Sequence, residues 1–232
     1  MLADIVPPEV AADEAFGDAP DVVLFPEEEA VVARAVDKRR REFASARACA
    51  RAGLARLGVP PVPILPGLRG APQWPPGIVG SMTHCAGYRA SAVARAGDML
   101  TLGLDAEPDD SLPDGVLGAV ASADERAALD ALASAAPAPS WDRLLFSAKE
   151  SVYKAWFPLT RRWLGFKEAA VTISPADGTF HARLLVEGPV VDGRRLTGFT
   201  GRWLASDGLI LTAIAVPRPS PSARRNGPPS GQ

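Results

Sequence analysis

Apolar residues recur at helical spacing in the stretch between Ser140 and Pro158. The apolar positions of this stripe, which runs on to the residue after Pro158, are Leu144, Ala148, Val152, Ala155, Trp156 and Leu159. A period of three to four residues predicts an amphipathic helix that buries the stripe. Glu150 and Lys154, four residues apart, would then lie together on the opposite side.

Three further helices follow from start and stop signals. Pro26 is suited to a first helical position, and the three glutamates after it complement the helix dipole. The helical pattern resumes at Phe43 and continues through Leu57 to Gly58, which stops it. Ser122 or Asp124 would cap another helix that reaches about Ala135, and a single helical turn is expected at residues 117–120.

Short apolar or alternating runs separated by turn residues predict strands, and Asp-Gly turns favour antiparallel pairing. The predicted strands are Val22–Phe25, Val79–Cys85, Tyr88–Ala96, Thr101–Leu104, Val171–Ser174, Thr179–Val186, Phe199–Ala205 and Leu209–Val216. The order of strands and helices indicates an α+β protein with two halves, 1–103 and 104–216. The remainder, 217–232, is rich in Pro, Ser, Arg and Gly, and we expect it to be a disordered tail.

Composition and charge exclude several classes of protein. The 232 residues are 47% hydrophobic and 22% charged, as in soluble globular proteins, and the net charge of −2 argues against a dedicated nucleic-acid binder. No apolar run approaches the roughly 20 residues needed to span a bilayer. Cys49 and Cys85 provide neither a disulfide framework nor a zinc site. The N-terminus does not resemble a secretory signal, so the expected compartment is the cytoplasm.

Carboxylates form the strongest candidate for chemistry. Asp105 and Glu107 alternate onto one face of a strand, and Glu150 stands one helical turn from Lys154. Oxygen ligands of this kind favour Mg²⁺ shared with a phosphorylated substrate. Two ordinary explanations remain open: Ser147 and Glu150 fit a helix capping box, and Glu150 with Lys154 fits an exposed ion pair.

Basic residues and one histidine are the other candidates. The arginines beside the second helix are Arg39, Arg40, Arg47, Arg51 and Arg56. They would form either a solvated face or a cradle for phosphate, because guanidinium groups bind phosphate oxygens bidentately. Arg69 precedes a glycine, which lets the backbone approach a ligand. His84, beside Thr83 at a strand end, is either structural or a phosphate ligand.

Three ordered motifs resemble the 4′-phosphopantetheinyl transferases, specifically the pseudo-dimeric surfactin- and enterobactin-type group and its actinobacterial members. The motifs are Gly80-Ser-Met-Thr-His-Cys85, Gly103-Leu-Asp-Ala-Glu107 and Phe146-Ser-Ala-Lys-Glu-Ser-Val-Tyr-Lys154. The resemblance covers about residues 5–216. It implies two similar α+β halves, each a small antiparallel sheet packed with a long helix. It also implies a cytoplasmic monomer that transfers phosphopantetheine from coenzyme A to a serine of acyl or peptidyl carrier proteins, releasing 3′,5′-ADP.

The same resemblance implies roles for individual residues. Asp105, Glu107 and Glu150 would hold Mg²⁺ against the pyrophosphate of coenzyme A, and Glu150 would also be the base for the carrier serine. Lys149 and Lys154 would neutralise charge on the phosphates, with Lys154 and His84 counted among the catalytic groups. The residues expected at the 3′-phosphate end are Arg39, Arg47, Arg69, Thr83 and His84.

Two other functions would use the same residues. A Mg²⁺-dependent nucleotide pyrophosphohydrolase would employ these acids and lysines with water as the nucleophile. A non-catalytic module that binds coenzyme A or a carrier protein would retain the fold without transfer. Product analysis separates the three, because hydrolysis needs no carrier protein.

Overall fold

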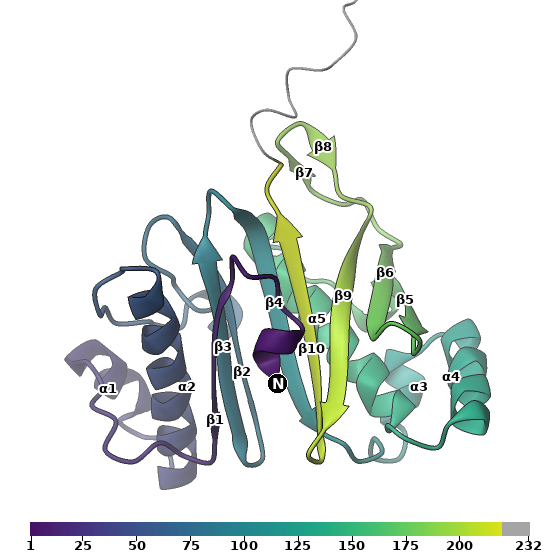
Figure 1. Ribbon diagram of the computed structural model, residues 1–232, viewed down its shortest axis with the longest axis horizontal. Coiled ribbons are helices and arrows are strands. Elements are labelled where there is room, and N and C mark those ends of the chain that lie inside the picture. Colours follow the sequence, from purple (N-terminus) through teal and green to yellow (C-terminus); the bar gives the residue numbers. More distant parts are fainter. Residues whose placement is uncertain (220–232) are drawn as a thin grey trace, which may run out of the picture.

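The computed structural model describes residues 1–219, and its architecture is α+β (Figure 1), which confirms the predicted fold class. The predicted tail beyond β10 lies outside the described residues from residue 220 onward. The helices are α1 (Pro26–Val32), α2 (Asp37–Arg56), α3 (Val116–Val120), α4 (Ala123–Ala135) and α5 (Trp141–Thr160), with short 3₁₀ turns η1 (Leu2–Asp4), η2 (Leu68–Gly70) and η3 (Phe166–Glu168). The strands are β1 (Ala11–Phe16), β2 (Ile78–Cys85), β3 (Tyr88–Arg95), β4 (Met99–Pro108), β5 (Ala169–Ser174), β6 (Thr179–Leu184), β7 (Val190–Val191), β8 (Arg194–Arg195), β9 (Gly198–Ser206) and β10 (Leu209–Pro217).

The strands form two main antiparallel sheets. One has the order β1-β3-β2 and packs against α2, while the other has the order β4-β10-β9-β6-β5 and packs against α5. A small β7–β8 hairpin extends beyond them. β4 runs through residues 103 and 104, and the division of the chain into two halves at that point stays a prediction.

Two elements of the first sheet differ from expectation. The predicted strand Val22–Phe25 is wrong: the segment is an unpaired connection whose Leu24 packs against α1 and α2. The outer strand is instead β1, which the sequence pattern did not reveal because it carries Asp13 and Glu14. Tyr88 Oη donates to Glu14 2.6 Å away, and Arg56 pairs with Asp13, so both acids are satisfied within the structure.

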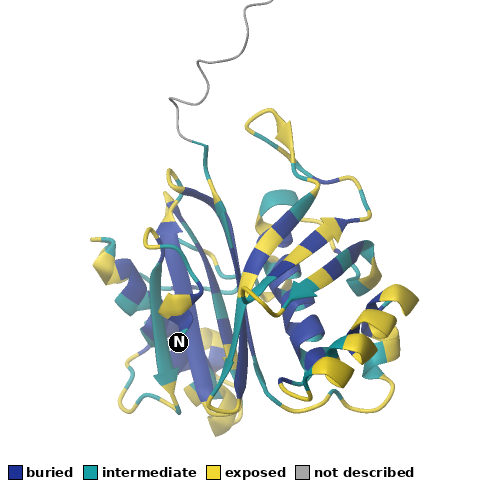
Figure 2. Ribbon diagram, turned by 45° about the vertical axis from the view of Figure 1, so that its right-hand side comes forward, coloured by how far each residue is buried: buried dark blue, intermediate teal, exposed yellow. Residues whose placement is uncertain are grey.

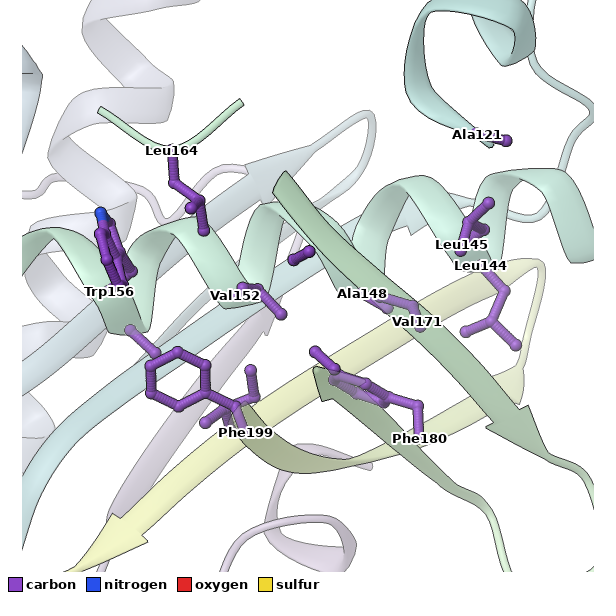
Figure 3. Close-up of a cluster of buried hydrophobic side chains, with 14 of the residues drawn as sticks. Ala121, Leu144, Leu145, Ala148, Val152, Trp156, Leu164, Val171, Phe180 and Phe199 are labelled. Atoms are coloured by element: carbon purple, nitrogen blue, oxygen red, sulfur yellow. The ribbon is translucent and has the colours of Figure 1, made fainter. Parts of the chain in front are cut away.

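Helix α5 buries the predicted apolar stripe (Figure 3). Leu144, Ala148, Val152 and Trp156 are all at most 1% exposed and face Val171, Phe180 and Phe199 of the sheet, whereas Leu159 is only partly buried. Burying such side chains stabilises the fold by roughly 1.5–3 kcal/mol each. The helix begins at Trp141, so Ser147 lies in its interior and the capping-box explanation for Ser147 and Glu150 is wrong.

The two sheets meet where β2 lies beside β4. Ser81 Oγ accepts a hydrogen bond of 3.0 Å from the Leu104 backbone N–H, and Thr83 Oγ1 accepts one of 3.1 Å from Ala106. Side-chain hydroxyls therefore satisfy backbone donors of β4 along an edge that no backbone ladder covers. Figure 2 shows continuous burial through this region, with exposed residues gathered on the outer turns and on α4. Among residues 1–219, no helix combines the length and apolarity needed to span a bilayer.

Candidate active site

The candidate site lies where β4 crosses α5 at unusually short range. A Cβ built on Gly103 would stand 2.0 Å from the carbonyl oxygen of Ser151, so only glycine permits this approach. Thr101 Oγ1 donates to the carbonyl of Ala155 at 2.8 Å, which fixes the same contact. Backbone proximity at these residues places the side chains at the end of β4 against the middle of α5.

Asp105 and Lys154 meet at this crossing. Lys154 Nζ lies 2.8 Å from Asp105 Oδ1 and 2.9 Å from the carbonyl of Leu104. Thr83 Oγ1 donates to the same Asp105 oxygen at 3.3 Å, which joins β2 to the group. Asp105 is 5% exposed, and its second oxygen, Oδ2, is buried without a hydrogen-bond partner in the described chain.

Glu107 and Glu150 complete the set of carboxylates. Burial raises the pKa of both, and the negative charge of Asp105 raises each further. Glu107 is paired with Arg143 of α5 at 3.1 Å, while the Glu150 side chain accepts no hydrogen bond within residues 1–219. The structure thus gathers carboxylates whose mutual repulsion is only partly compensated by Lys154 and Arg143.

These acids do not form a ready-made metal centre, since no three His, Cys, Asp or Glu side chains in the described part of the chain come close enough to hold an ion. Their chemistry nevertheless fits Mg²⁺, which prefers carboxylate oxygens from one or two residues together with water and substrate phosphate. The unpartnered Oδ2 of Asp105 supports this fit, because a buried carboxylate oxygen without a donor is costly unless a cation occupies its lone pairs.

His84 and Arg39 form a second polar group at the end of β2. Arg39 Nη1 lies 2.8 Å from His84 Nε2, and because a guanidinium only donates, that imidazole nitrogen must be the acceptor. Glu42 lies 4.0 Å from the other nitrogen, Nδ1. Burial and the charge of Arg39 lower the pKa of His84, so the ring is neutral at neutral pH.

Arg47 is committed to the fold instead of facing solvent. Its Nε donates to the carbonyl of Ile64 at 3.0 Å, it lies 3.9 Å from the buried Glu28, and its guanidinium packs over the Phe43 ring. Burial lowers its pKa to about 10. Arg47 therefore links α2 to α1 and to the proline-rich segment, which separates it from the exposed Arg39.

Arg69 lines a cavity of about 680 Å³ that also contains Glu150, Lys154 and Arg161. Its guanidinium packs 5.2 Å from the ring of Trp163, so η2 and the loop after α5 contact each other across this cavity. A larger cavity, of about 790 Å³, lies between η1 and the outer side of β10, and none of the candidate residues line it.

Lys149 points away from this group. Its Nζ lies 2.9 Å from the Glu125 carboxylate and donates to three carbonyl groups, those of Val120, Phe166 and Ala169. The side chain is almost fully buried and joins α5 to α4 and β5. Among the residues that sequence reasoning missed is Arg143, although its spacing of seven from Glu150 places both on one helix face.

Comparison with known proteins assigns the chain to a family. The family model described as the 4′-phosphopantetheinyl transferase N-terminal domain matches residues 27–94, and the model described as the 4′-phosphopantetheinyl transferase superfamily matches residues 101–196. The two matched segments flank and contain the crossing of β4 and α5.

Full-length relatives agree. The chain is 58% identical to the 4′-phosphopantetheinyl transferase Svp of Streptomyces mobaraensis, covering 100% of this chain and 96% of that protein. It is 47% identical to PptT of Mycobacterium tuberculosis (93% and 98%) and 51% identical to Npt of Nocardia iowensis (93% and 99%), both also 4′-phosphopantetheinyl transferases. The chain belongs to the 4′-phosphopantetheinyl transferase superfamily, which confirms the resemblance found in its motifs.

Proposed function

We propose that this protein transfers the 4′-phosphopantetheine group from coenzyme A to a serine hydroxyl of acyl or peptidyl carrier proteins. The serine oxygen forms a bond to the β-phosphorus of coenzyme A, the bond from that phosphorus to the bridging oxygen breaks, and 3′,5′-ADP leaves. The observation that carries this proposal is the cluster of Asp105, Glu107, Glu150 and Lys154 at the crossing of β4 and α5. Phosphoryl transfer depends on such positioning and charge neutralisation.

Glu150 is the proposed base for the serine proton. Its raised pKa increases its basicity, and its side chain faces the cavity without a competing hydrogen bond in the described residues. Lys154 is the proposed stabiliser of the phosphate charge, because its ammonium reaches the same cavity while Asp105 and the Leu104 carbonyl orient it. Thr83 supports this arrangement through its hydrogen bond to Asp105.

Asp105, Glu107 and Glu150 would hold Mg²⁺. The ion would neutralise the diphosphate and so stabilise both the pentavalent phosphorus and the departing oxygen. The buried Oδ2 of Asp105 and the raised pKa values of both glutamates support a cation at this position.

His84 and Arg39 are proposed to bind the 3′-phosphate of coenzyme A. Both are exposed at the end of β2, and their hydrogen bond holds the guanidinium in place. Arg69 supplies a further positive charge at the large cavity. Arg47 would support this end from behind, since its own donors are directed at Ile64 and Phe43. Lys149 is left out because its donors are all used within the fold.

We further propose that the protein acts as a cytoplasmic monomer. Both family-matched segments are present in one chain, and both contribute to the junction of β2, β4 and α5 that forms the site.

Intact-protein mass spectrometry tests the reaction. An apo carrier protein incubated with this protein, coenzyme A and Mg²⁺ should gain the mass of one phosphopantetheine, and chelation of Mg²⁺ should abolish the gain. Glu150→Gln should abolish transfer while coenzyme A binding stays measurable by calorimetry. Breakdown of coenzyme A without carrier modification would indicate hydrolysis, and binding without either reaction would indicate a binding module.

A further inference from the structure

The loop that follows α5 carries an exposed basic and aromatic surface beside the candidate site. Arg161, Arg162 and Lys167 are exposed, and none of them forms an ion pair within residues 1–219. The segment 161–168 contains three basic residues and one acid, although the whole chain has a net charge of −2. Positive charge is therefore concentrated here and left unpaired.

A large aromatic side chain lies in the middle of this charge. Trp163 is 58% exposed, and its ring packs against Tyr153 at 5.0 Å and under the Arg69 guanidinium. Leu68, 62% exposed, precedes Arg69 on the other side of this contact. An exposed tryptophan held rigidly among basic residues is typical of the central anchor of a protein interface.

Position ties this surface to the chemistry. Trp163 and Glu150 line the same cavity of about 180 Å³, and Arg161 and Glu150 line the larger one. A macromolecule that presents a hydroxyl to Glu150 must therefore cover the loop after α5. The loop is fixed there, because the indole of Trp156 donates to the Arg162 carbonyl at 2.9 Å and Lys149 donates to that of Phe166.

We propose that Leu68, Arg161, Arg162, Trp163 and Lys167 form the docking surface for the acceptor carrier protein, through an acidic and partly apolar face beside its acceptor serine. The proposal rests on the proposed function. Complementary charge would guide the carrier to this surface and set its orientation, while Trp163 would supply the buried contact.

The decisive variant is Arg162→Glu combined with Lys167→Glu. The matched control is Arg183→Glu combined with Arg202→Glu, which makes the same charge change. Arg183 and Arg202 are exposed on β6 and β9, where the alternate residues Ala182 and Phe180 face the core beneath α5, so these arginines lie on the opposite side of the sheet. Trp163→Ala tests the aromatic contact, and circular dichroism checks that all variants fold.

Binding of an apo carrier protein is measured without coenzyme A, transfer kinetics are measured with it, and coenzyme A affinity is measured alone. We expect the charge-reversed loop to raise the carrier Kd and KM about tenfold or more and to flatten their dependence on salt. Its coenzyme A affinity should stay unchanged, as should every property of the control. Trp163→Ala should raise the carrier Kd.

Several results would overturn the docking surface: unchanged carrier binding in the loop variants, an equal effect in the control, or a parallel loss of coenzyme A affinity. Failure of the unaltered protein to bind any carrier would also overturn it. Carrier binding without transfer would instead refute the proposed function, and the binding measurement would still decide whether this loop is the docking surface.

Discussion

Lys154 Nζ on α5 lies 2.8 Å from Asp105 Oδ1 on β4, a pairing that crosses the closest backbone contact between the two elements. The ammonium is 27% exposed, so it remains accessible from the cavity that Glu150 lines. One lysine thereby reaches both a candidate metal ligand and the space for a phosphate. Lys149, five positions earlier, has the same chemistry but is buried against Glu125.

The two lysines should therefore respond differently to the same substitution. Lys154→Gln should reduce kcat by about 10²-fold or more, because charge on the transferring phosphoryl group is no longer neutralised. Its melting temperature should change little, since the side chain is partly exposed. Lys149→Gln should instead destabilise the protein by roughly 3–5 kcal/mol, because Glu125 is left buried without its partner. Thermal unfolding and steady-state kinetics on both variants check this, and a stable but inactive Lys149→Gln would contradict it.

Arg39 should act on one part of coenzyme A only. If its guanidinium binds the 3′-phosphate, Arg39→Ala should weaken coenzyme A binding by about tenfold or more but leave 3′-dephospho-coenzyme A unaffected. Calorimetry with both ligands makes the comparison. Arg40→Ala, on the neighbouring position and paired with Glu29, is the control and should bind both ligands as the unaltered protein does. Equal weakening for the two ligands would remove Arg39 from the 3′-phosphate.

His84 should make coenzyme A affinity depend on pH. Burial and Arg39 hold the pKa of the free protein's imidazole below its ordinary value of 6.5. A bound phosphate would favour the imidazolium and raise that pKa, so affinity should rise as the pH falls through the raised value and level off below the lowered one. Because the phosphate itself titrates near pH 6, the quantity to measure is the difference between the unaltered protein and His84→Gln. A difference independent of pH would exclude phosphate contact by His84.

Much of the fold could be predicted because its elements bury one clear face. The stripe from Leu144 to Trp156 and the alternation in β6, β9 and β10 follow directly from their packing. β1 could not be found, because its acids are satisfied by Tyr88 and Arg56, partners that lie far away in the sequence. Val22–Phe25 has the composition of a strand, but no neighbouring strand is available for it to pair with.

The candidate site could be predicted in part for a similar reason. Asp105, Glu107, Glu150 and Lys154 follow simple periodicities, which place them on defined faces of β4 and α5. Which arginines and lysines remain free for a ligand could not be read from spacing. Arg47 and Lys149 are taken up by carbonyl and carboxylate groups that only the folded chain brings to them.

Gly103 should be required for both stability and catalysis. A methyl group there would meet the Ser151 carbonyl at 2.0 Å, so β4 and α5 would have to move apart. We expect Gly103→Ala to destabilise the protein by about 1–3 kcal/mol or more, and to lower kcat further than this loss explains when it is assayed well below its melting temperature. Gly118→Ala is the control, because nothing lies within 4 Å of its added carbon. A Gly103→Ala variant with normal kcat would show that the spacing of β4 and α5 does not position the reacting groups.

Glu125 should account for part of the protein's sensitivity to acid. Burial opposes its ionisation, but hydrogen bonds from the backbone N–H groups of Ser122 and Val171 and from Lys149 outweigh that effect and lower its pKa below the ordinary 4.5. A lowered pKa in the folded state means that the ionised carboxylate stabilises the fold above about pH 4.5, and that this contribution is lost as the pH falls through the lowered value.

Urea unfolding of the unaltered protein and of Glu125→Gln, followed from pH 7 to about pH 3, measures this contribution. The variant should be the less stable of the two by roughly 3 kcal/mol at neutral pH, because Lys149 loses its only carboxylate partner among the described residues. The difference between the two proteins should shrink below about pH 4.5, since the other acids titrate alike in both. Curves that stay parallel across this range would show that ionisation of Glu125 does not stabilise the fold.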